Sequence, residues 1–302
     1  MVAVAAAGLN HADLLQLLGD YPPPPGESTV PGLECAGTVL ATREGNEGSA
    51  LAAPGGLFAP GARVMALVAG GAHAERAAIP VGQLMPVPAN LSFVEGAAIP
   101  EAGLTAWTNL VVEGGLAAGE SVLVTGATGG MGTMLVQLAS ELGARVIAAG
   151  RDRERLERLR PLGADEVVTL GELPARVRAL TAGRGVDLGI DLVGGAGIDG
   201  HLAALCNGGR LVLLGLLAGR RAEVDLGAVL SRRLRVVGSV LRARPRPEKA
   251  ALVAAFSAFA LPRLADGRLR PVVDRVLPFD RAGEAYAGLA RGEVAGKIVL
   301  EM

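Results

Sequence analysis

Apolar positions follow two different patterns along the chain, and the pattern changes near Ser121. Before residue 99, short apolar runs alternate with clusters of proline and glycine, and these runs lie at 37–41, 62–68 and 74–79. Proline and glycine interrupt regular structure and begin turns. We therefore predict that residues 1–98 form a small twisted β domain with irregular connections.

From Ser121 onward, short buried-strand runs alternate with helical patterns. The predicted strands are 121–125, 145–149, 167–170, 188–192, 210–214 and 235–240. The predicted helices between them are 131–142, 152–160, 173–180 and 198–205. This alternation is typical of a parallel sheet that is covered by helices on both faces.

The last part of the chain returns to the first kind of structure. A long apolar helix is predicted at 247–265, and strand character follows at 272–277 and 297–300. The simplest fold is an α/β chain in which a doubly wound parallel-sheet domain is inserted into a β-rich domain. We place the inserted domain at 99–241 and the β-rich domain at 1–98 and 242–302.

Composition excludes several classes of function. Half of the 302 residues are hydrophobic, a fifth are charged, and the net charge is −1. These values predict a soluble globular protein and argue against a nucleic-acid or anionic membrane partner. No apolar run approaches the roughly 18 residues of a membrane span, and no signal peptide opens the chain. The two distant cysteines, Cys35 and Cys206, favour a reducing cytoplasm and exclude a four-thiolate zinc site.

A glycine-rich segment joins the first strand of the inserted domain to its first helix. It reads G-x-x-G-G-x-G and consists of Gly126, Ala127, Thr128, Gly129, Gly130, Met131 and Gly132. Glycines allow a pyrophosphate to approach the backbone, and the helix N-terminus presents free N–H groups to it. The spacing differs from G-x-G-x-x-G, and an ordinary glycine turn is the alternative in a chain with 44 glycines. Because a strand precedes it and a helix follows, we predict dinucleotide binding.

The end of the second strand favours NADPH over NADH. Gly150 lies where an NAD enzyme usually carries an acidic residue for the ribose hydroxyl, so no carboxylate repels a 2′-phosphate there. Arg151, Arg153 and Arg155 follow and offer charge-assisted hydrogen bonds. The alternative is that these arginines pair with neighbouring acidic side chains on a solvated helix face.

Several motifs, taken in order, resemble one family over essentially the whole chain. They are AAGLNHADLLQ at 6–16, YPPPPG at 21–26, PGLECAG at 31–37, IPEAGLTAW at 99–107, GAD at 163–165, DLVGG at 191–195 and GKIVL at 296–300. The chain resembles the zeta-crystallin-like quinone oxidoreductases, the zinc-independent branch of the medium-chain dehydrogenase/reductase superfamily. The resemblance implies a GroES-like catalytic domain, a Rossmann domain, a cleft between them, NADPH as hydride donor and a homodimer.

The resemblance also implies roles for single residues. Asn10 matches a residue beside the nicotinamide, and Tyr21 matches one that lines the substrate cleft. Implied contacts to the cofactor, besides the glycine turn, come from Asn10, Thr105, Arg155, Gly215, Leu241 and Lys297. Independently of the resemblance, Gly150 and Arg151 at the end of the second strand are cofactor-binding candidates. The places of the catalytic zinc ligands in metal-dependent relatives hold Asn10, Leu33 and Glu101, a set that does not bind zinc. Relative to the family, the chain starts inside a later strand, which implies either residues upstream or an unprotected sheet edge.

Hydride transfer to an acceptor such as a quinone needs orientation and hydrogen bonds more than a metal. Asn10 is a candidate donor to the acceptor oxygen or the nicotinamide ribose, and Tyr21 is a candidate phenolic donor. Asp13 is the third candidate, although holding its loop or a water fits it better than general acid catalysis. For all three residues the alternative is a hydrogen bond that only stabilises the loop.

We therefore expect an NADPH-dependent reductase of quinones or related activated carbonyls and alkenes. A 2-enoyl thioester reductase and a non-catalytic NADPH-binding sensor remain alternatives, while RNA binding has little support. The apolar run 210–217 suggests a sheet edge that pairs across a two-fold axis in a homodimer. His201, on a predicted helix of the inserted domain, is expected to face solvent.

Overall fold

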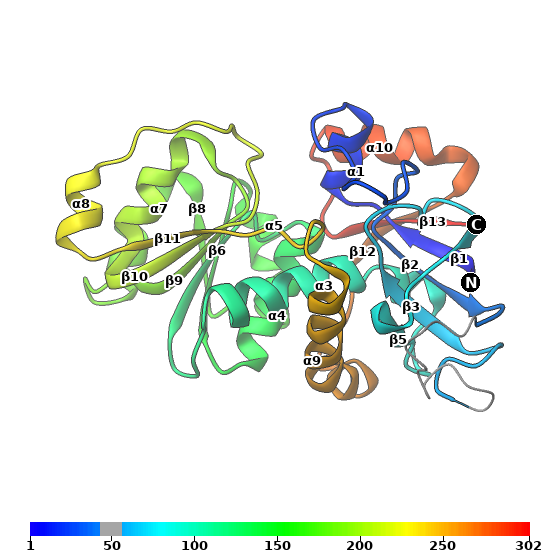
Figure 1. Cartoon of the computed structure of the whole chain (residues 1–302). Helices are drawn as coiled ribbons and strands as arrows, with labels where there is room; N and C mark the ends of the chain where they lie inside the picture. Colours follow the sequence, from blue (N-terminus) through cyan, green and yellow to red (C-terminus); the bar gives the residue numbers. More distant parts are fainter. Residues whose placement is uncertain (43–55) are drawn as a thin grey trace. The chain divides into compact units, whose positions relative to one another are not determined.

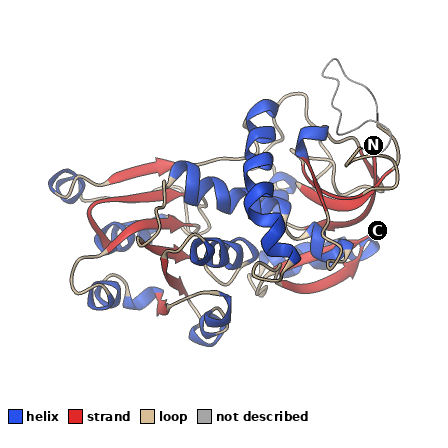
Figure 2. Ribbon diagram, turned by 90° about the horizontal axis from the view of Figure 1, so that it is seen from below, coloured by secondary structure: helices blue, strands red, loops and turns tan. Residues whose placement is uncertain are grey.

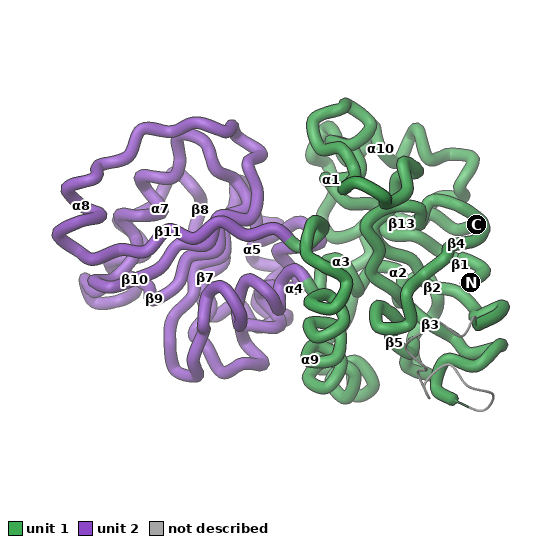
Figure 3. Tube along the Cα trace, viewed as in Figure 1, with its two compact units in different colours: residues 1–104, 241–302 green, residues 105–240 purple. Residues whose placement is uncertain are grey.

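The computed structural model describes residues 1–42 and 56–302 of the chain. These residues form two compact units, one made of Met1–Leu104 with Leu241–Met302 and the other of Thr105–Val240 (Figure 3). The second unit starts at Thr105, inside helix α3 (Pro100–Trp107), rather than at residue 99. Leu241 belongs to the first unit and not to the inserted one.

The first unit is built on a seven-stranded sheet (Figure 1). Its strands are β1 (Val2–Gly8), β2 (Glu34–Val39), β3 (Arg63–Leu67), β4 (Arg76–Ala77), β5 (Leu84–Pro86), β12 (Val273–Pro278) and β13 (Lys297–Glu301). The order is β12-β13-β1-β2-β3-β5, with β4 paired to β1. All pairs are antiparallel except β12–β13. The first strand, β1, therefore lies inside the sheet and not at its edge.

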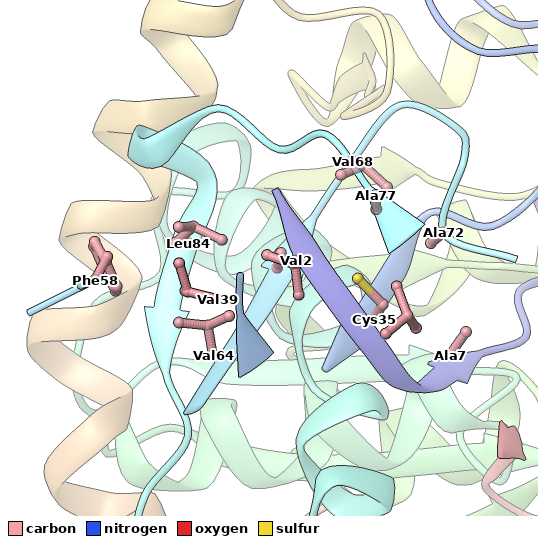
Figure 4. Close-up of a cluster of buried hydrophobic side chains, with 12 residues drawn as sticks. Val2, Ala7, Cys35, Val39, Phe58, Val64, Val68, Ala72, Ala77 and Leu84 are labelled. Carbon is pink, nitrogen blue, oxygen red and sulfur yellow. The ribbon is translucent and has the colours of Figure 1, made fainter. Parts of the chain in front are cut away.

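Small apolar side chains fill the core beside this sheet. Figure 4 shows Val2, Cys35, Val64 and Leu84 from successive strands gathered into one cluster. Alternate residues of a strand point to one face, which is why single positions of β1, β2 and β3 meet there. Burial, with a smaller effect of Glu34, raises the pKa of the Cys35 thiol to about 12. Both cysteines are free and buried, and the cytoplasmic location stays a prediction.

Four α-helices, besides the start of α3, complete the described part of the first unit. They are α1 (His11–Leu17), α2 (Phe93–Ala97), α9 (Arg246–Ala265) and α10 (Ala282–Ala290). Ser92 and Glu95 form a capping box that begins α2. Helix α9 matches the helix predicted at 247–265, and its Phe256 is buried against Gly103, where an added Cβ would lie 2.4 Å from the ring.

The second unit contains a six-stranded sheet in which every pair is parallel (Figure 2). Its strands are β6 (Ser121–Thr125), β7 (Arg145–Gly150), β8 (Glu166–Thr169), β9 (Val186–Asp191), β10 (Leu205–Leu213) and β11 (Arg235–Gly238). Its helices are α4 (Gly130–Glu141), α5 (Arg153–Glu157), α6 (Ala175–Leu180), α7 (Ile198–Ala204) and α8 (Leu226–Ser231), and a π-helix (Thr108–Glu113) continues α3.

The strand order β11-β10-β9-β6-β7-β8 confirms a doubly wound Rossmann-type sheet. From β6 the chain runs to β7 and β8 on one side, and from β9 to β10 and β11 on the other. Helices α4 and α7 lie on opposite faces as a result (Figure 1). The order reverses between β6 and β9, and ligands of such sheets bind at the carboxyl ends of the strands beside this reversal.

One prediction about the sheet edge was wrong. The run 210–217 was expected to form the edge, but β10 lies between β9 and β11 and is paired on both sides. The short strand β11 covers it and forms the edge instead, with Val236 46% exposed. In the part of the chain that the structure describes, no helix is long and apolar enough to cross a membrane.

Candidate active site

The glycine turn lies at the reversal point of the parallel sheet, between β6 and α4. Gly126 has a φ of +69°, which side-chain-bearing residues rarely adopt. A Cβ on Gly132 would lie 2.4 Å from the carbonyl oxygen of Gly126 and 2.5 Å from Cα of Ala127. At Gly129 the nearest atom to an added Cβ is 3.8 Å away. Gly132 therefore lets α4 pack directly on the turn, whereas Gly129 borders open space.

The first turn of α4 is suited to hold a phosphate. The first N–H groups of a helix have no partner within the helix, and Gly129 has no side chain to cap them. The predicted residues Ala127 to Met131 surround this N-terminus, with Ala127 buried and the others partly exposed. Free N–H groups and the positive end of the helix dipole together favour an anion here.

A buried polar group connects the ends of β6 and β9. The carboxylate of Asp191 accepts hydrogen bonds from the Thr125 hydroxyl at 2.9 Å and from the Val193 amide at 2.8 Å. Nδ1 of His201 lies 3.0 Å from its other oxygen. Burial by itself would raise the pKa of Asp191, but His201 and the amides of Val193 and Gly194 outweigh it and lower the pKa. His201, 3% exposed, is thus buried, and the prediction that it faces solvent was wrong.

Two other predicted residues of this unit lie at the same edge of the sheet as the glycine turn, because parallel strands end together. Gly150 ends β7, and Gly215 follows β10. A Cβ on Gly215 would lie 2.5 Å from the Leu192 carbonyl oxygen, so this loop passes close to the end of β9. Thr105, further back in α3, is buried, and its carbonyl accepts the Asn109 side-chain amide at 2.7 Å.

The three arginines after β7 differ in their partners. One terminal nitrogen of Arg153 donates to both oxygens of Glu172, at 2.9 and 2.8 Å. Arg155 lies 3.6 Å from Asp152, which caps α5. Arg151 is exposed and has no ion pair among the described residues. Arg153 and Arg155 therefore pair with acidic side chains, as the alternative interpretation of these arginines expected. Arg151 remains available to a ligand.

In the first unit, Asn10, Glu34 and Lys297 form a buried network. The Asn10 amide nitrogen donates to Glu34 at 2.8 Å, and Lys297 donates to the Asn10 side-chain oxygen at 2.7 Å. Lys297 also donates to the Leu9 carbonyl at 2.9 Å and forms an ion pair with Glu34. The other oxygen of Glu34 accepts the Glu101 amide at 2.8 Å. One amide hydrogen of the half-buried Asn10 stays free for a ligand, whereas the three donors of Lys297 are used.

Asp13 is fully buried, and it holds the loops around Asn10. Its two oxygens accept the backbone amides of Asn10 and Gly32, both at 2.9 Å. Burial is the largest influence on its pKa, which is raised despite the opposing effect of the nearby His73. His73 is itself buried, with Nδ1 2.8 Å from the Tyr286 hydroxyl. The contacts of Asp13 are those of the loop-holding role expected for it.

Tyr21 is held by a buried arginine that sequence reasoning missed. The guanidinium carbon of Arg242 lies 5.1 Å from the centre of the Tyr21 ring, and the side chain donates to the Tyr21 carbonyl at 3.1 Å. Arg242 also donates to the Ala69 carbonyl at 2.8 Å and to the side chain of Gln16. Burial, followed by the charge of Glu101, raises the pKa of Tyr21, so its phenol stays protonated and able to donate. Leu241, next to Arg242, is 4% exposed.

Comparisons with known proteins place the chain in a family. Residues 1–89 match the alcohol dehydrogenase GroES-like domain, and residues 130–258 match a domain described as zinc-binding dehydrogenase. The chain is 36% identical to the quinone oxidoreductase of Thermus thermophilus, whose structure was solved alone and with NADPH. The two structures superpose with a TM-score of 0.81, and the match covers 100% of this chain and 90% of that one.

Two curated relatives add to this. A quinone oxidoreductase-like protein 2 homolog of Nematostella vectensis is 29% identical over 99% of this chain and 80% of its own length. A phenolphthiocerol/phthiocerol polyketide synthase of Mycobacterium tuberculosis is 33% identical over the whole chain, which covers 13% of that protein. The chain belongs to the quinone oxidoreductase family of the medium-chain dehydrogenase/reductase superfamily. The predicted GroES-like and Rossmann-type folds are confirmed.

Proposed function

We propose that the protein is an NADPH-dependent reductase that transfers hydride to quinones or related activated carbonyls and alkenes without a metal. The observation that carries the proposal is the uncapped N-terminus of α4, packed on the glycine turn by Gly132 at the reversal point of the sheet. The similarity to a quinone oxidoreductase that was solved with NADPH supports the same cofactor here.

The second unit supplies the binding groups for the cofactor. We assign the pyrophosphate to the free amides of Gly130, Met131 and Gly132, and the 2′-phosphate to Arg151. When bound, NADPH supplies the hydride. A guanidinium forms charge-assisted hydrogen bonds to a phosphate, and the exposed Arg151 has no acidic partner among the described residues that competes for it.

The first unit supplies hydrogen bonds to the acceptor. Asn10 offers its remaining amide hydrogen, and Lys297 and Glu34 fix the orientation of this amide. Tyr21 offers a phenolic hydrogen bond from a ring held by Arg242. Zinc-dependent relatives carry their metal ligands at three positions, which in this chain hold Asn10, Leu33 and Glu101. The Asn10 side-chain amide is already hydrogen-bonded to Lys297, Leu33 is apolar and buried, and Glu101 supplies a single carboxylate. Zinc needs several nitrogen, sulfur or carboxylate donors, and this set does not provide them.

The first experiment compares NADPH and NADH binding by nucleotide fluorescence and then adds 1,4-benzoquinone. We expect tight NADPH binding and rapid oxidation. Arg151→Gln should weaken NADPH binding about tenfold and leave NADH binding within about twofold, since one charge-assisted contact is lost. Arg153→Gln is the matched control and should keep the NADPH affinity. Equal effects of both substitutions would remove Arg151 from the proposal.

Asn10→Ala and Tyr21→Phe test the acceptor side. Loss of one donor to a developing oxyanion typically lowers kcat by about 10²–10³-fold, and we expect Asn10→Ala to fall near the lower end. Tyr21→Phe keeps the ring over Arg242 and removes only the hydroxyl. Unchanged turnover in both variants, with normal NADPH binding, would exclude both side chains from the chemistry.

A 2-enoyl thioester reductase is the second candidate, favoured by the similarity to a polyketide synthase. Both reactions use the same donor, so the acceptor decides between them. Oxidation of NADPH by a crotonyl thioester but not by 1,4-benzoquinone would favour this alternative. Binding of NADPH without turnover on either acceptor would favour the non-catalytic sensor.

We also propose a homodimer formed through the edge strand β11. Apolar side chains are exposed around this edge: Val236 is 46% exposed, and Leu226 and Leu230 of the preceding α8 are 75% and 81% exposed. An exposed apolar patch beside unpaired backbone groups favours pairing with a second copy. Light scattering at micromolar concentration should give a dimer mass, and Val236→Lys should shift it toward the monomer. A monomeric wild type would refute the dimer.

A further inference from the structure

The inserted unit contains a second candidate binding site at the sheet edge opposite the glycine turn. A pocket of about 460 Å³ is lined by Arg178, Gly183, Arg184, Cys206, Asn207 and Arg232. Strand β9 begins at Val186 and β10 at Leu205, so these residues gather at the amino ends of the parallel strands. The glycine turn lies at the carboxyl ends, and the two sites share no residue. This volume is within the range of pockets that bind small molecules.

Two of the three arginines in this pocket have no acidic partner among the described residues. Arg178 donates to the backbone carbonyls of Gly183 at 3.1 Å and Ala203 at 2.8 Å. Arg232 donates to the carbonyls of Leu202, at 3.1 Å, and Leu205. These bonds fix both guanidinium groups in place and leave further N–H donors on each, because a guanidinium carries five.

The third arginine is neutralised within the protein. Arg184 donates to both oxygens of Asp187, at 2.7 and 2.6 Å, and the Ser121 hydroxyl and amide also donate to this carboxylate. Because Asp187 neutralises one of the three arginines, two positive charges remain uncompensated at the pocket. Burial and then the charge of Arg178 lower the pKa of Arg232, so the two unpaired guanidinium groups repel each other.

We infer that this pocket binds the phosphate group of a small anionic molecule. A phosphate dianion matches the two uncompensated charges, and fixed guanidinium groups recognise its oxygens through paired hydrogen bonds. The pocket has room for a group attached to the phosphate. Asn207, exposed at its border, adds an amide to the lining.

Isothermal titration calorimetry with inorganic pyrophosphate tests this site, with NADPH present to fill the glycine turn. Asn207→Asp is the main variant, because it adds a negative charge to the pocket without removing any hydrogen bond made by the arginines. We expect it to weaken pyrophosphate binding about tenfold, which is the effect of one like charge at short range in a partly solvated site. Arg232→Gln should weaken binding at least as much.

Arg176→Gln is the matched control. Arg176 is exposed on the same helix, α6, but does not line the pocket, so its loss should change the affinity by less than about twofold. No detectable binding to the wild type at about 10 mM pyrophosphate would overturn the inference, since this is weaker than a site with two fixed cations allows. Equal affinities of Asn207→Asp and wild type would overturn it as well, because binding would then lie elsewhere. Neither result bears on the proposed reductase activity.

Discussion

Replacing Gly132 with alanine tests whether the packing of α4 on the glycine turn sets cofactor affinity. The new Cβ would lie 2.4 Å from the Gly126 carbonyl oxygen and 2.5 Å from two backbone atoms of Ala127. Carbon atoms in contact normally lie about 3.5–4.0 Å apart, so helix and turn must separate by about 1 Å. Because the close atoms belong to the backbone, no side chain can rotate away to relieve the contact.

The expected magnitudes separate binding from folding. A misplacement of about 1 Å can lower the reaction rate by about 10²-fold at a site that depends on exact geometry. By the same reasoning, NADPH affinity should fall by about 10- to 100-fold. Overpacking costs about 1–3 kcal/mol of stability, while alanine in place of glycine in a helix returns about 1 kcal/mol. The net loss of unfolding free energy should therefore stay below about 2 kcal/mol, and the variant should fold.

The assay is a fluorescence titration with NADPH, accompanied by urea unfolding without nucleotide. Gly129→Ala is the matched control, because its Cβ meets nothing closer than 3.8 Å and Gly129 has an ordinary φ of −79°. Its unfolding free energy should stay within about 0.5 kcal/mol of the wild type. Wild-type NADPH affinity in a folded Gly132→Ala protein would show that α4 and the turn do not form the cofactor site.

Three further predictions concern stability. Lys297→Met leaves the fully buried Glu34 without its cation and should lower the free energy of unfolding in urea by about 3–5 kcal/mol, part of which a second substitution, Glu34→Gln, should recover. A loss below about 1 kcal/mol would contradict the network. Asp191 has a folded pKa below its usual 3.8, so its contribution to stability is complete above that pH and is lost as the pH falls through the folded pKa. The melting temperature of Asp191→Asn should therefore decline less from pH 5 toward pH 3 than that of the wild type, and identical declines would refute this. Ser92→Ala removes the cap of α2 and should cost about 1 kcal/mol in urea unfolding.

Local patterns were sufficient to predict most of the second unit. Residues 121–125 were predicted as a strand and form β6, and the helix predicted at 131–142 differs from α4 by one residue at each end. The spacing of hydrophobic residues and the presence of a glycine turn depend only on residues that are close together in the sequence, so both can be recognised from the sequence alone. The position of β10 was missed because an apolar run has the same sequence pattern in an edge strand as in an interior strand. The strand β11, which covers β10, has only four residues, and its sequence does not show which strand it pairs with.

The candidate site was harder to predict, because its contacts join distant parts of the chain. Lys297 and Asn10 are 287 residues apart, and no local pattern links them. His201 lies on a short helix and was expected to be exposed; Asp191, which explains its burial, precedes that helix at the end of β9. A signal was nevertheless present for Glu34, which lies in the family motif at 31–37 although no role was assigned to it.

The pairing of β1 with β13 has a consequence for the order in which the protein folds during synthesis. Ala6 and Ala7 pair with Glu301 and Leu300, so during synthesis β1 receives one of its neighbours only after β13 has left the ribosome. The second unit is continuous from Thr105 to Val240 and needs no later residues. We therefore expect it to fold on the growing chain, while β1 stays unpaired on one side and exposed to aggregation until β13 has been synthesised.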